Sequence, residues 1–298
     1  MFNAQTITTL IIFGLLLNAC AISPKQMTSL PVYETRLISK GEYWHLPEAV
    51  QAHNTNAEQY IQEELQRAHQ HYLAQILSFH QRHHLPLPEV DLYAISSTHI
   101  DQKQLHALIS NQMTHLDQKT EQAVHNAQKQ HLALLKLREL LLAIEQQTHR
   151  YTLMQVHQLF AAQYQAPEQI WNLTYLEQEF NRIWKTLHLG LNVSAQPPHD
   201  MLLSSSLRAA LDAASIKITS ERNSPFTLKV SLQQNKKNSA QLSFRLLKGF
   251  EAQAHLSWGI KKVEQRDSPS SAAGLMEKAD ELIRKETRSI LIQLIARL

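Results

Sequence analysis

A long run of residues without glycine or proline restricts the fold of this chain more than any other feature. No glycine lies between Gly41 and Gly190, and the 78 residues between Pro88 and Pro167 contain no proline. Both residue types break helices and shape turns, so their scarcity favours long helices over a sheet with many turns. The sequence therefore predicts a helical domain over residues 46–190.

Hydrophobic spacing predicts two helices in the first part of this region. The first runs from about residue 57 to residue 84, where apolar side chains recur every three or four positions before a proline-containing segment. The second begins after Asp101, a suitable N-cap, and carries a heptad-like stripe to about residue 163, which suits an antiparallel coiled coil. The sequence leaves open whether the second helix is continuous or broken, and the weak positions Thr120 and Gln130 mean that the stripe is not a strong oligomerisation signal.

A third helix is expected after Pro167, with its end at Gly190, a favourable helix stop. Its broad apolar face includes Ile170, Trp171 and Trp184. We expect both tryptophans in the core.

The hydrophobic pattern changes period after residues 191–200, which hold two adjacent prolines and are expected to form a linker. A helix is expected over residues 201–214, followed by three stretches that alternate apolar with polar or small residues. Such alternation is typical of strands in a sheet with one buried face. The alternating positions are Phe226, Leu228, Val230, Leu232, Leu242, Phe244, Leu246, Ala254, Leu256, Trp258 and Ile260.

Two further elements complete the expected C-terminal domain, residues 201–298. Residues 216–219 fit a short edge strand, and Ser270 or Ser271 can cap a final amphipathic helix. The predicted fold class is a mainly α N-terminal helical hairpin or bundle, followed by a small α+β domain with an antiparallel sheet.

The first twenty residues carry a targeting pattern. Residues 7–17 are apolar but too short for a membrane-spanning helix, and the sequence Leu17–Asn18–Ala19–Cys20 follows. This sequence resembles the lipobox of bacterial lipoproteins, which have an aliphatic residue, a tolerant position, a small residue and then cysteine. The resemblance implies cleavage between Ala19 and Cys20 and acylation of Cys20, a stable membrane anchor when several chains are attached.

The lipobox resemblance defines a signal peptide at residues 1–19 and a tether at residues 20–45. No Lys or Arg precedes the apolar stretch, which departs from the family pattern, and an ordinary secretory leader with a chance cysteine is the alternative. Cys20 is the only cysteine of the chain, which favours the lipid interpretation because a single cysteine cannot form an intramolecular disulfide.

The residue after the cysteine bears on localisation. In lipoproteins of bacteria with two membranes, aspartate at this position commonly retains the protein in the inner membrane, whereas this chain has Ala21. The resemblance therefore implies an outer-membrane lipoprotein facing the periplasm, or a cell-surface lipoprotein in a Gram-positive host. The expected partners are the membrane, through the lipid anchor, and an envelope protein, and the export signal argues against nucleic acid.

Composition indicates a folded chain with an uneven charge. It is 43% hydrophobic and 18% charged, which fits a folded protein. Residues 200–298 contain 16 Lys and Arg against 10 Asp and Glu, a net charge of +6. This basic region suits contact with lipopolysaccharide phosphates, phospholipid head groups or another acidic surface, and a solvated basic face is the alternative.

One group of histidines has a spacing typical of metal ligands. His80, His83 and His84 end the first expected helix, and positions three and four apart share a helix face. His80 with His83 or His84 is therefore a candidate zinc or copper site. No other metal ligands and no cofactor are predicted.

Catalytic motifs give weak signals. Ser204, Ser205 and Ser206 lie close in sequence to His199 and Asp200, but this stretch also reads as a linker and the start of a helix. The chain lacks the His-Glu-x-x-His, Gly-x-Ser-x-Gly and phosphate-loop motifs. We therefore predict no catalytic residues, although the fold can bring together a site that one sequence does not reveal.

Other polar residues are predicted to be solvated. The pair Glu63 and Glu64 is expected on an exposed helix face, and so are His69 and His71, on different faces. Lys236, with the lysine after it, is expected at the tip of a hairpin, where it forms a charged turn or touches an anionic lipid or glycan.

The leading functional hypothesis is a non-catalytic, lipid-anchored envelope protein that acts as a scaffold, assembly factor or regulator. An envelope hydrolase with a site between the domains is the first alternative, and a metal-handling lipoprotein is the second. The order of elements in the last 100 or so residues resembles small domains of outer-membrane assembly and peptidoglycan-synthase-activator lipoproteins. That resemblance transfers no functional residues.

Overall fold

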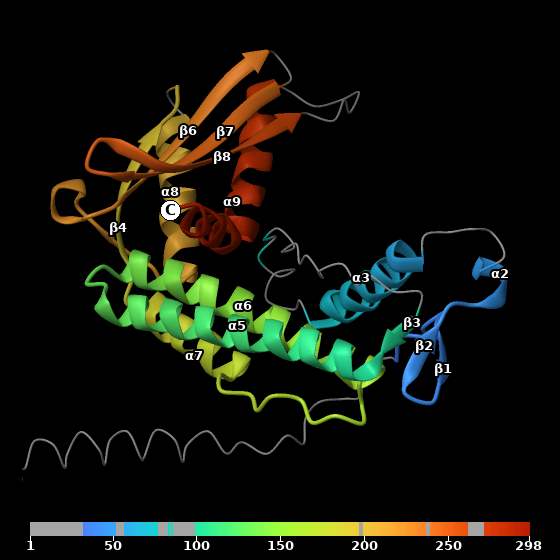
Figure 1. The fold of residues 1–298 in the computed structure, drawn as a ribbon. Helices are drawn as coiled ribbons and strands as arrows, with labels where there is room; N and C mark the ends of the chain where they lie inside the picture. The colour runs from blue at the N-terminus through green and yellow to red at the C-terminus, as the bar shows by residue number, and fades with distance from the viewer. Residues whose placement is uncertain are drawn as a thin grey trace, which may run out of the picture. The chain divides into compact units, whose positions relative to one another are not determined.

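The computed structural model describes residues 32–51, 57–76, 83, 85, 99–196, 199–236, 239–261 and 271–298. Contacts divide the chain into two compact units, which are described separately. Unit 1 includes residues 32–76, 99–111 and 152–172, and unit 2 includes residues 112–151 and 173–298, each within the described ranges. The order is a helical region followed by a mixed five-stranded sheet with helices, which confirms the predicted class of α followed by α+β (Figure 1).

Unit 1 begins with a small antiparallel sheet. The strands β1 (Ile38–Lys40) and β2 (Tyr43–His45) form a hairpin, and β3 (His99–Asp101) pairs with β2. Gly41 has a φ of 61°, a left-handed conformation that glycine adopts without steric cost, and this lets the chain turn between β1 and β2. These strands occupy the end of the stretch that was expected to be tether.

The helices of unit 1 pack their apolar faces into one core. The short helix α2 (Glu48–Gln51) precedes α3 (Ala57–Ile76), and parts of two later helices, residues 102–111 and 152–160, belong to the same unit. The indole Nε1 of Trp44, in β2, donates a hydrogen bond of 2.9 Å to the carbonyl oxygen of Phe160. The core residues are Leu37, Leu46, Ile61, Leu65, Ala68, Tyr72, Leu73, Leu105, Ile109, Val156 and Phe160.

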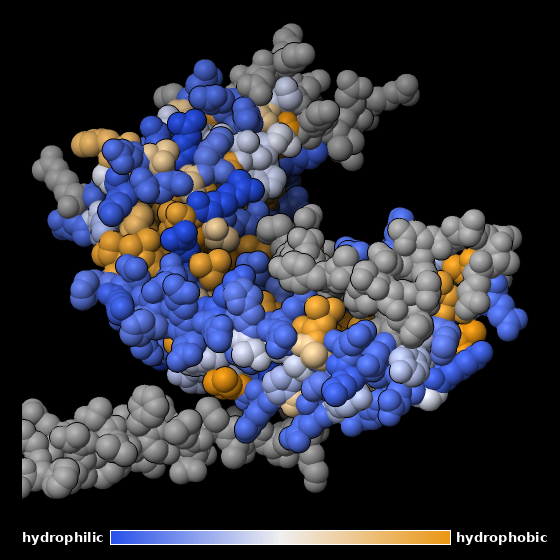
Figure 2. Space-filling view, in the orientation of Figure 1, coloured by the Kyte–Doolittle hydropathy of each residue, from blue (hydrophilic) through white to orange (hydrophobic). Residues whose placement is uncertain are grey.

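The long helical region is a hairpin of two helices, α5 (Gln102–Lys129) and α6 (Ala133–Phe160). As predicted, Asp101 caps α5: its Oδ1 accepts a hydrogen bond of 2.8 Å from the backbone N–H of Lys103. Residues 130–132 separate the two helices, so the expected long helix is broken beside the weak position Gln130. Figure 2 shows a largely hydrophilic surface over α5 and α6, as expected for a hairpin whose outer face is in water.

A buried polar network joins the two helices of the hairpin. The Nε of Arg150 lies 3.1 Å from Oδ2 of Asp117, and both side chains are almost fully buried. The amide nitrogen of Gln147 donates hydrogen bonds to Asp117 at 2.9 Å and to Thr120 at 3.0 Å. Thr120 follows Asp117 along α5, whereas its partner Gln147 precedes Arg150 along α6, so the two helices run antiparallel.

Unit 2 contains a mixed sheet of order β5-β4-β6-β7-β8. The strand β4 (His188–Ser194) pairs in parallel with β5 (Lys217–Thr219) and with β6 (Thr227–Lys236). The strands β6, β7 (Ser239–Lys248) and β8 (Glu251–Lys261) form an antiparallel meander, as the alternating pattern predicted. The expected edge strand at residues 216–219 corresponds to β5.

The strand β4 corrects two expectations. Residues 191–194 belong to the sheet and not to a linker, and the preceding helix ends at Trp184 and not at Gly190. A Cβ atom at Gly190 would lie 2.6 Å from Oγ1 of Thr227, so this glycine permits the close approach of β4 and β6. Sequence reasoning mistook this requirement for a helix stop.

Helices cover one face of the five-stranded sheet. The helix α8 (His199–Ala213) follows β4, and α9 (Ser271–Ala296) contacts α8, β7 and β8 (Figure 1). Along β6 and β7 the side chains on this face are buried, whereas those on the opposite face are polar and more exposed. The predicted single buried face is thus observed.

The helix α7 (Leu173–Trp184) begins later than predicted. Residues 165–172 form no helix, so Ile170 is exposed and not on an apolar helix face, and Trp171 is only half-buried. Trp184 is buried, as expected, and its Nε1 donates to the carbonyl oxygen of Ala214 at 2.8 Å. Within the described part of the chain, no helix combines the length and apolar character needed to cross a membrane.

Candidate functional site

The main candidate site is a pocket of about 510 Å³ within unit 2, which we call the basic pocket. Three helices form it: the end of α7, the C-terminal end of α8 and the middle of α9. Its described lining residues are Asn181, Trp184, Lys185, Ala210, Ala213, Ala214, Ser215, Arg284, Lys285, Thr287 and Arg288. Four of these side chains are cationic and none is acidic.

Two of the cations are held by neighbouring side chains. The guanidinium carbon of Arg288 lies 5.2 Å from the centroid of the Trp184 ring, and its Nη2 donates to Oδ1 of Asn181 at 2.5 Å. Arg284 pairs through Nε with Oδ2 of Asp280 at 2.8 Å. A cation–π contact of this kind stabilises by roughly 0.5–1 kcal/mol at an exposed site, and it also orients the guanidinium group.

The other two cations have no such neighbours. No ion pair joins Lys185 or Lys285 to a carboxylate of the described residues. Arg284 and Arg288 lie four residues apart on α9, and like charges at this spacing cost about 0.2–0.5 kcal/mol. The pocket therefore brings the positive charge of Lys185, just after α7, together with the three cations of α9.

The carbonyl oxygens at the C-terminal end of α8 already accept hydrogen bonds, so they do not compete with a ligand for the cations of the pocket. Ser215 has a φ of 63°, and its N–H donates to the carbonyl oxygen of Asp212 at 2.8 Å, while Ile216 donates to that of Leu211 at 2.9 Å. These are the two hydrogen bonds of a Schellman cap. With the Trp184 bond to Ala214, they pair carbonyl oxygens at the end of α8 that have no partner within the helix.

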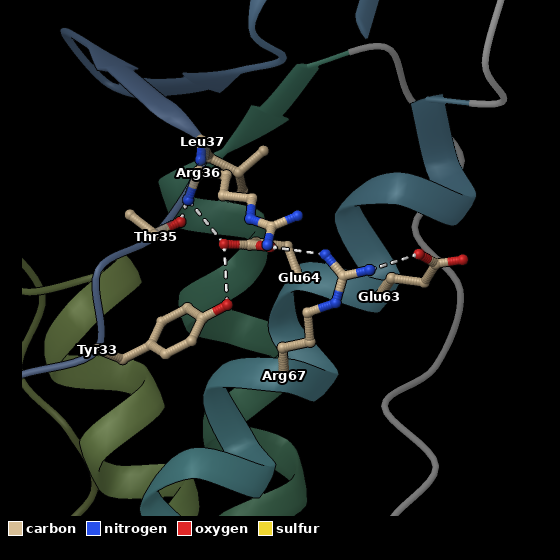
Figure 3. Close-up of polar contacts among 7 residues, drawn as sticks. All are labelled: Tyr33, Thr35, Arg36, Leu37, Glu63, Glu64 and Arg67. Carbon is tan, nitrogen blue, oxygen red and sulfur yellow. Dashed lines mark hydrogen bonds and ion pairs between the residues drawn. The ribbon is translucent and has the colours of Figure 1, made fainter.

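A second polar cluster fastens the N-terminal segment to α3, and we call it the Glu64 clasp (Figure 3). The Oε1 atom of Glu64 accepts a hydrogen bond of 2.7 Å from the backbone N–H of Arg36 and one of 3.1 Å from the Tyr33 hydroxyl. Its Oε2 lies 3.5 Å from Nη1 of Arg67, which also pairs with Glu63. Figure 3 shows the Glu64 carboxylate between the Tyr33 hydroxyl and the Arg67 guanidinium group.

The clasp corrects the expectation that Glu64 is solvated. Its side chain is fully buried, whereas Glu63 is partly exposed. Burial, followed by the negative charge of Glu64, raises the pKa of Tyr33, so Tyr33 stays a neutral donor. The signal was present in the sequence, since Glu64 lies three residues after Ile61 and four before Ala68, on the apolar face of the helix.

His69 is also buried, contrary to the expectation of a solvated side chain. Burial lowers the pKa of His69 to about 4, so its imidazole is neutral near pH 7. Like Glu64, it lies on the apolar face of α3, four residues after Leu65 and three before Tyr72.

A pair of histidines in unit 1 was not predicted. The Nδ1 atom of His106 lies 2.8 Å from Nε2 of His157, and the His106 ring stacks on Tyr164 with centroids 5.0 Å apart. Burial, and then the charge of His106, lower the pKa of His157. One imidazole therefore donates to the other, an arrangement that links α5 to the end of α6.

The predicted lipidation and metal residues are mostly outside the described residues. Ala19, Cys20, His80 and His84 lie there, so neither the cleavage site nor the histidine cluster is described. His83 is described: it is buried, and its carbonyl oxygen accepts a hydrogen bond from Gln293 of α9 at 3.2 Å. Among the residues with described placement, no group of three His, Cys, Asp or Glu side chains could hold a metal ion.

The serine cluster forms the start of α8, as its helical interpretation predicted. Oδ1 of Asp200 accepts a hydrogen bond from the backbone N–H of Met201, and the Ser205 hydroxyl donates to the carbonyl oxygen of Leu202. Ser206 donates to Asp280, and this bond is the main cause of the lowered pKa of that carboxyl. The side chains of Asp200, Ser205 and Ser206 thus each make a hydrogen bond within the fold.

Comparisons with protein-family models, with curated proteins and with solved structures gave no match for this chain. The basic pocket was not predicted residue by residue. Its one sequence signal was the excess of positive charge over residues 200–298, but Lys185 lies outside that range and reaches the pocket only through the fold.

Proposed function

We propose that this chain is a lipid-anchored protein of the bacterial envelope, most consistent with the outer membrane, that acts as a non-catalytic scaffold, assembly factor or regulator. The observation that carries the proposal is the sequence Leu17–Asn18–Ala19–Cys20 after a short apolar stretch. Acylation of the Cys20 thiol and of the freed amine would give an anchor of several chains, and such an anchor holds a protein stably in a bilayer.

The Glu64 clasp supports this proposal by limiting the reach of the anchor. Tyr33 is the thirteenth residue after Cys20, and a chain of that length spans at most about 45 Å. A lipidated Cys20 would therefore keep Tyr33, and with it the Glu64 clasp on α3, within about 45 Å of the membrane surface. A protein held at this range is suited to act on partners near the same membrane.

The basic pocket also favours binding over catalysis. Its described lining holds no carboxylate or histidine, the side chains that most often act as the general base that activates a serine or threonine hydroxyl. The lysines and arginines that line it suit a bound anion. No described contact favours the hydrolase or the metal-handling alternative.

The anchor is tested by expressing the Cys20→Ser variant in a bacterial host and separating membrane from soluble fractions. We expect the wild type in the membrane fraction and the variant in the soluble one or at an uncleaved precursor size. Ser23→Ala, a substitution in the same segment, serves as the control and should behave as the wild type. Membrane retention of a cleaved Cys20→Ser variant would contradict the anchor.

The scaffold role is tested by chemical crosslinking in intact cells, purification of the chain and mass spectrometry of its crosslinked peptides. We expect crosslinks from described surface lysines to one recurring envelope protein. These crosslinks should be lost with Cys20→Ser, because the chain then leaves the membrane. Crosslinks only within this chain, at a yield that recovers those internal links well, would argue against a scaffold.

A further inference from the structure

We propose that the basic pocket binds the phosphate monoester group of a ligand, a role that goes beyond the proposed scaffold function. The pocket brings Lys185, the residue that follows α7, together with three cations of α9 that lie about 100 residues later in the sequence. Its volume of about 510 Å³ is within the range of small-molecule sites. All of its walls belong to unit 2.

The charge of the pocket points to an anion with more than one negative charge. A phosphate monoester carries about −1.5 to −2 charges at pH 7 and three acceptor oxygens, whereas a carboxylate or a phosphodiester carries a single charge. Arg284 is already paired with Asp280, but the described lining holds three further cations and no acidic side chain of its own, so a doubly charged anion balances the charge of the pocket better than a singly charged one.

The donors of the pocket are partly fixed before any ligand arrives. Trp184 and Asn181 hold the guanidinium group of Arg288. Asp280 contacts Arg284 through Nε, so this ion pair does not use the two Nη nitrogens of Arg284. Donors that are already oriented lose less conformational entropy on binding. Planar guanidinium groups also match the geometry of phosphate oxygens.

The carbonyl oxygens at the C-terminal end of α8 are not free to pair with the cations of the pocket. The carbonyl oxygens of Ala210, Leu211, Asp212 and Ala214 already accept hydrogen bonds of 2.8–3.0 Å from other groups of the chain. The Thr287 hydroxyl likewise donates to Ile283. The lysine ammonium groups of the pocket thus remain the local groups without a described carboxylate partner.

Isothermal titration calorimetry of the full chain in neutral detergent tests the proposal. The probes are inorganic phosphate, pyrophosphate and dihexanoyl phosphatidic acid, with dihexanoyl phosphatidylcholine as the probe without a monoester. Binding of phosphatidic acid much tighter than of inorganic phosphate would identify a lipid head group as the source. Equal binding of both would identify a soluble phosphate, and both results support the monoester site.

The Lys185→Gln/Lys285→Gln variant should weaken monoester binding about tenfold or more, because it removes two of the four charges at the site. The Lys229→Gln/Lys248→Gln variant is the matched control: it removes the same charge from β6 and β7, and its affinity should change less than about twofold. Thermal unfolding of both variants checks that they are folded. Absence of monoester binding by the wild type, or equal weakening in both variants, would overturn the proposal.

Discussion

The Glu64 clasp allows a sharp test of how the N-terminal segment is held. In the Glu64→Ala variant, the N–H of Arg36 and the Tyr33 hydroxyl lose their shared acceptor, which now lies 2.7 and 3.1 Å away. Hydrogen bonds to a charged group contribute about 1.5–3 kcal/mol each. Because Tyr33 is only half-buried, solvent weakens its bond, and we take about 0.5–1 kcal/mol for it, so the expected total loss is about 2–4 kcal/mol.

Hydrogen–deuterium exchange followed by mass spectrometry measures this loss locally. Since about 1.4 kcal/mol is a factor of ten, amides in a peptide that covers residues 33–45 should exchange about 30- to 1,000-fold faster when this segment opens. The free energy of global unfolding is expected to change less, because the N-terminal segment can open while the core around α3 stays packed.

Glu63→Ala is the matched control for the clasp. Glu63 is the neighbouring glutamate, but it is partly exposed, and it contacts Arg67 and Gln59 on the same helix. A surface pair of this kind contributes about 0–1 kcal/mol, so exchange over residues 33–45 should stay near that of the wild type. If Glu64→Ala and Glu63→Ala accelerate exchange equally, or if neither does, the clasp does not hold this segment.

Three other predictions concern stability. Arg150→Met should lower the thermal midpoint of unfolding by about 8–16 °C, because breaking a buried ion pair costs about 3–5 kcal/mol. Adding Asp117→Leu should recover most of that loss, because no buried charge then lacks a partner. If the double variant recovers no stability, the unpaired carboxylate of Asp117 is not the cause of the loss. Ser215→Gly should raise stability to urea by about 0.5–1 kcal/mol, since glycine adopts the φ of 63° without steric cost, and a decrease would contradict strain there. The lowered pKa of His69, about 4, means that the unfolded state binds a proton between pH 6.5 and 4 while the folded state does not, so stability falls as the pH falls through this range. His69→Leu should remove about 3 kcal/mol of that fall, and an unchanged pH dependence of unfolding would refute the assignment.

Local patterns explain which parts of the fold were predictable. The meander β6–β8 was found because its buried positions alternate, and the cap Asp101 was found because capping depends on adjacent residues. The strand β4 was missed because it is seven residues long and includes Gly190, whose role depends on contact with Thr227 of another strand.

The candidate sites depend on contacts that sequence spacing does not display. The partners of Glu64 in the clasp lie 28 and 31 residues before it, and Arg288 meets Asn181 across 107 residues. A buried glutamate on an apolar helix face was visible in the sequence, but its partners were not. The basic pocket requires the packing of α7 against α8 and α9, so charge composition alone could indicate only a basic region.

Mass spectrometry of the N-terminal peptide from the chain purified from bacterial membranes tests the central claim most directly. We expect a mature chain that begins at Cys20, with a diacylglyceryl group on its thiol and an acyl chain on its amine where the host adds one. A chain that begins at another residue, or a Cys20 with an unmodified thiol, would contradict the lipid anchor and with it the proposed membrane-bound role.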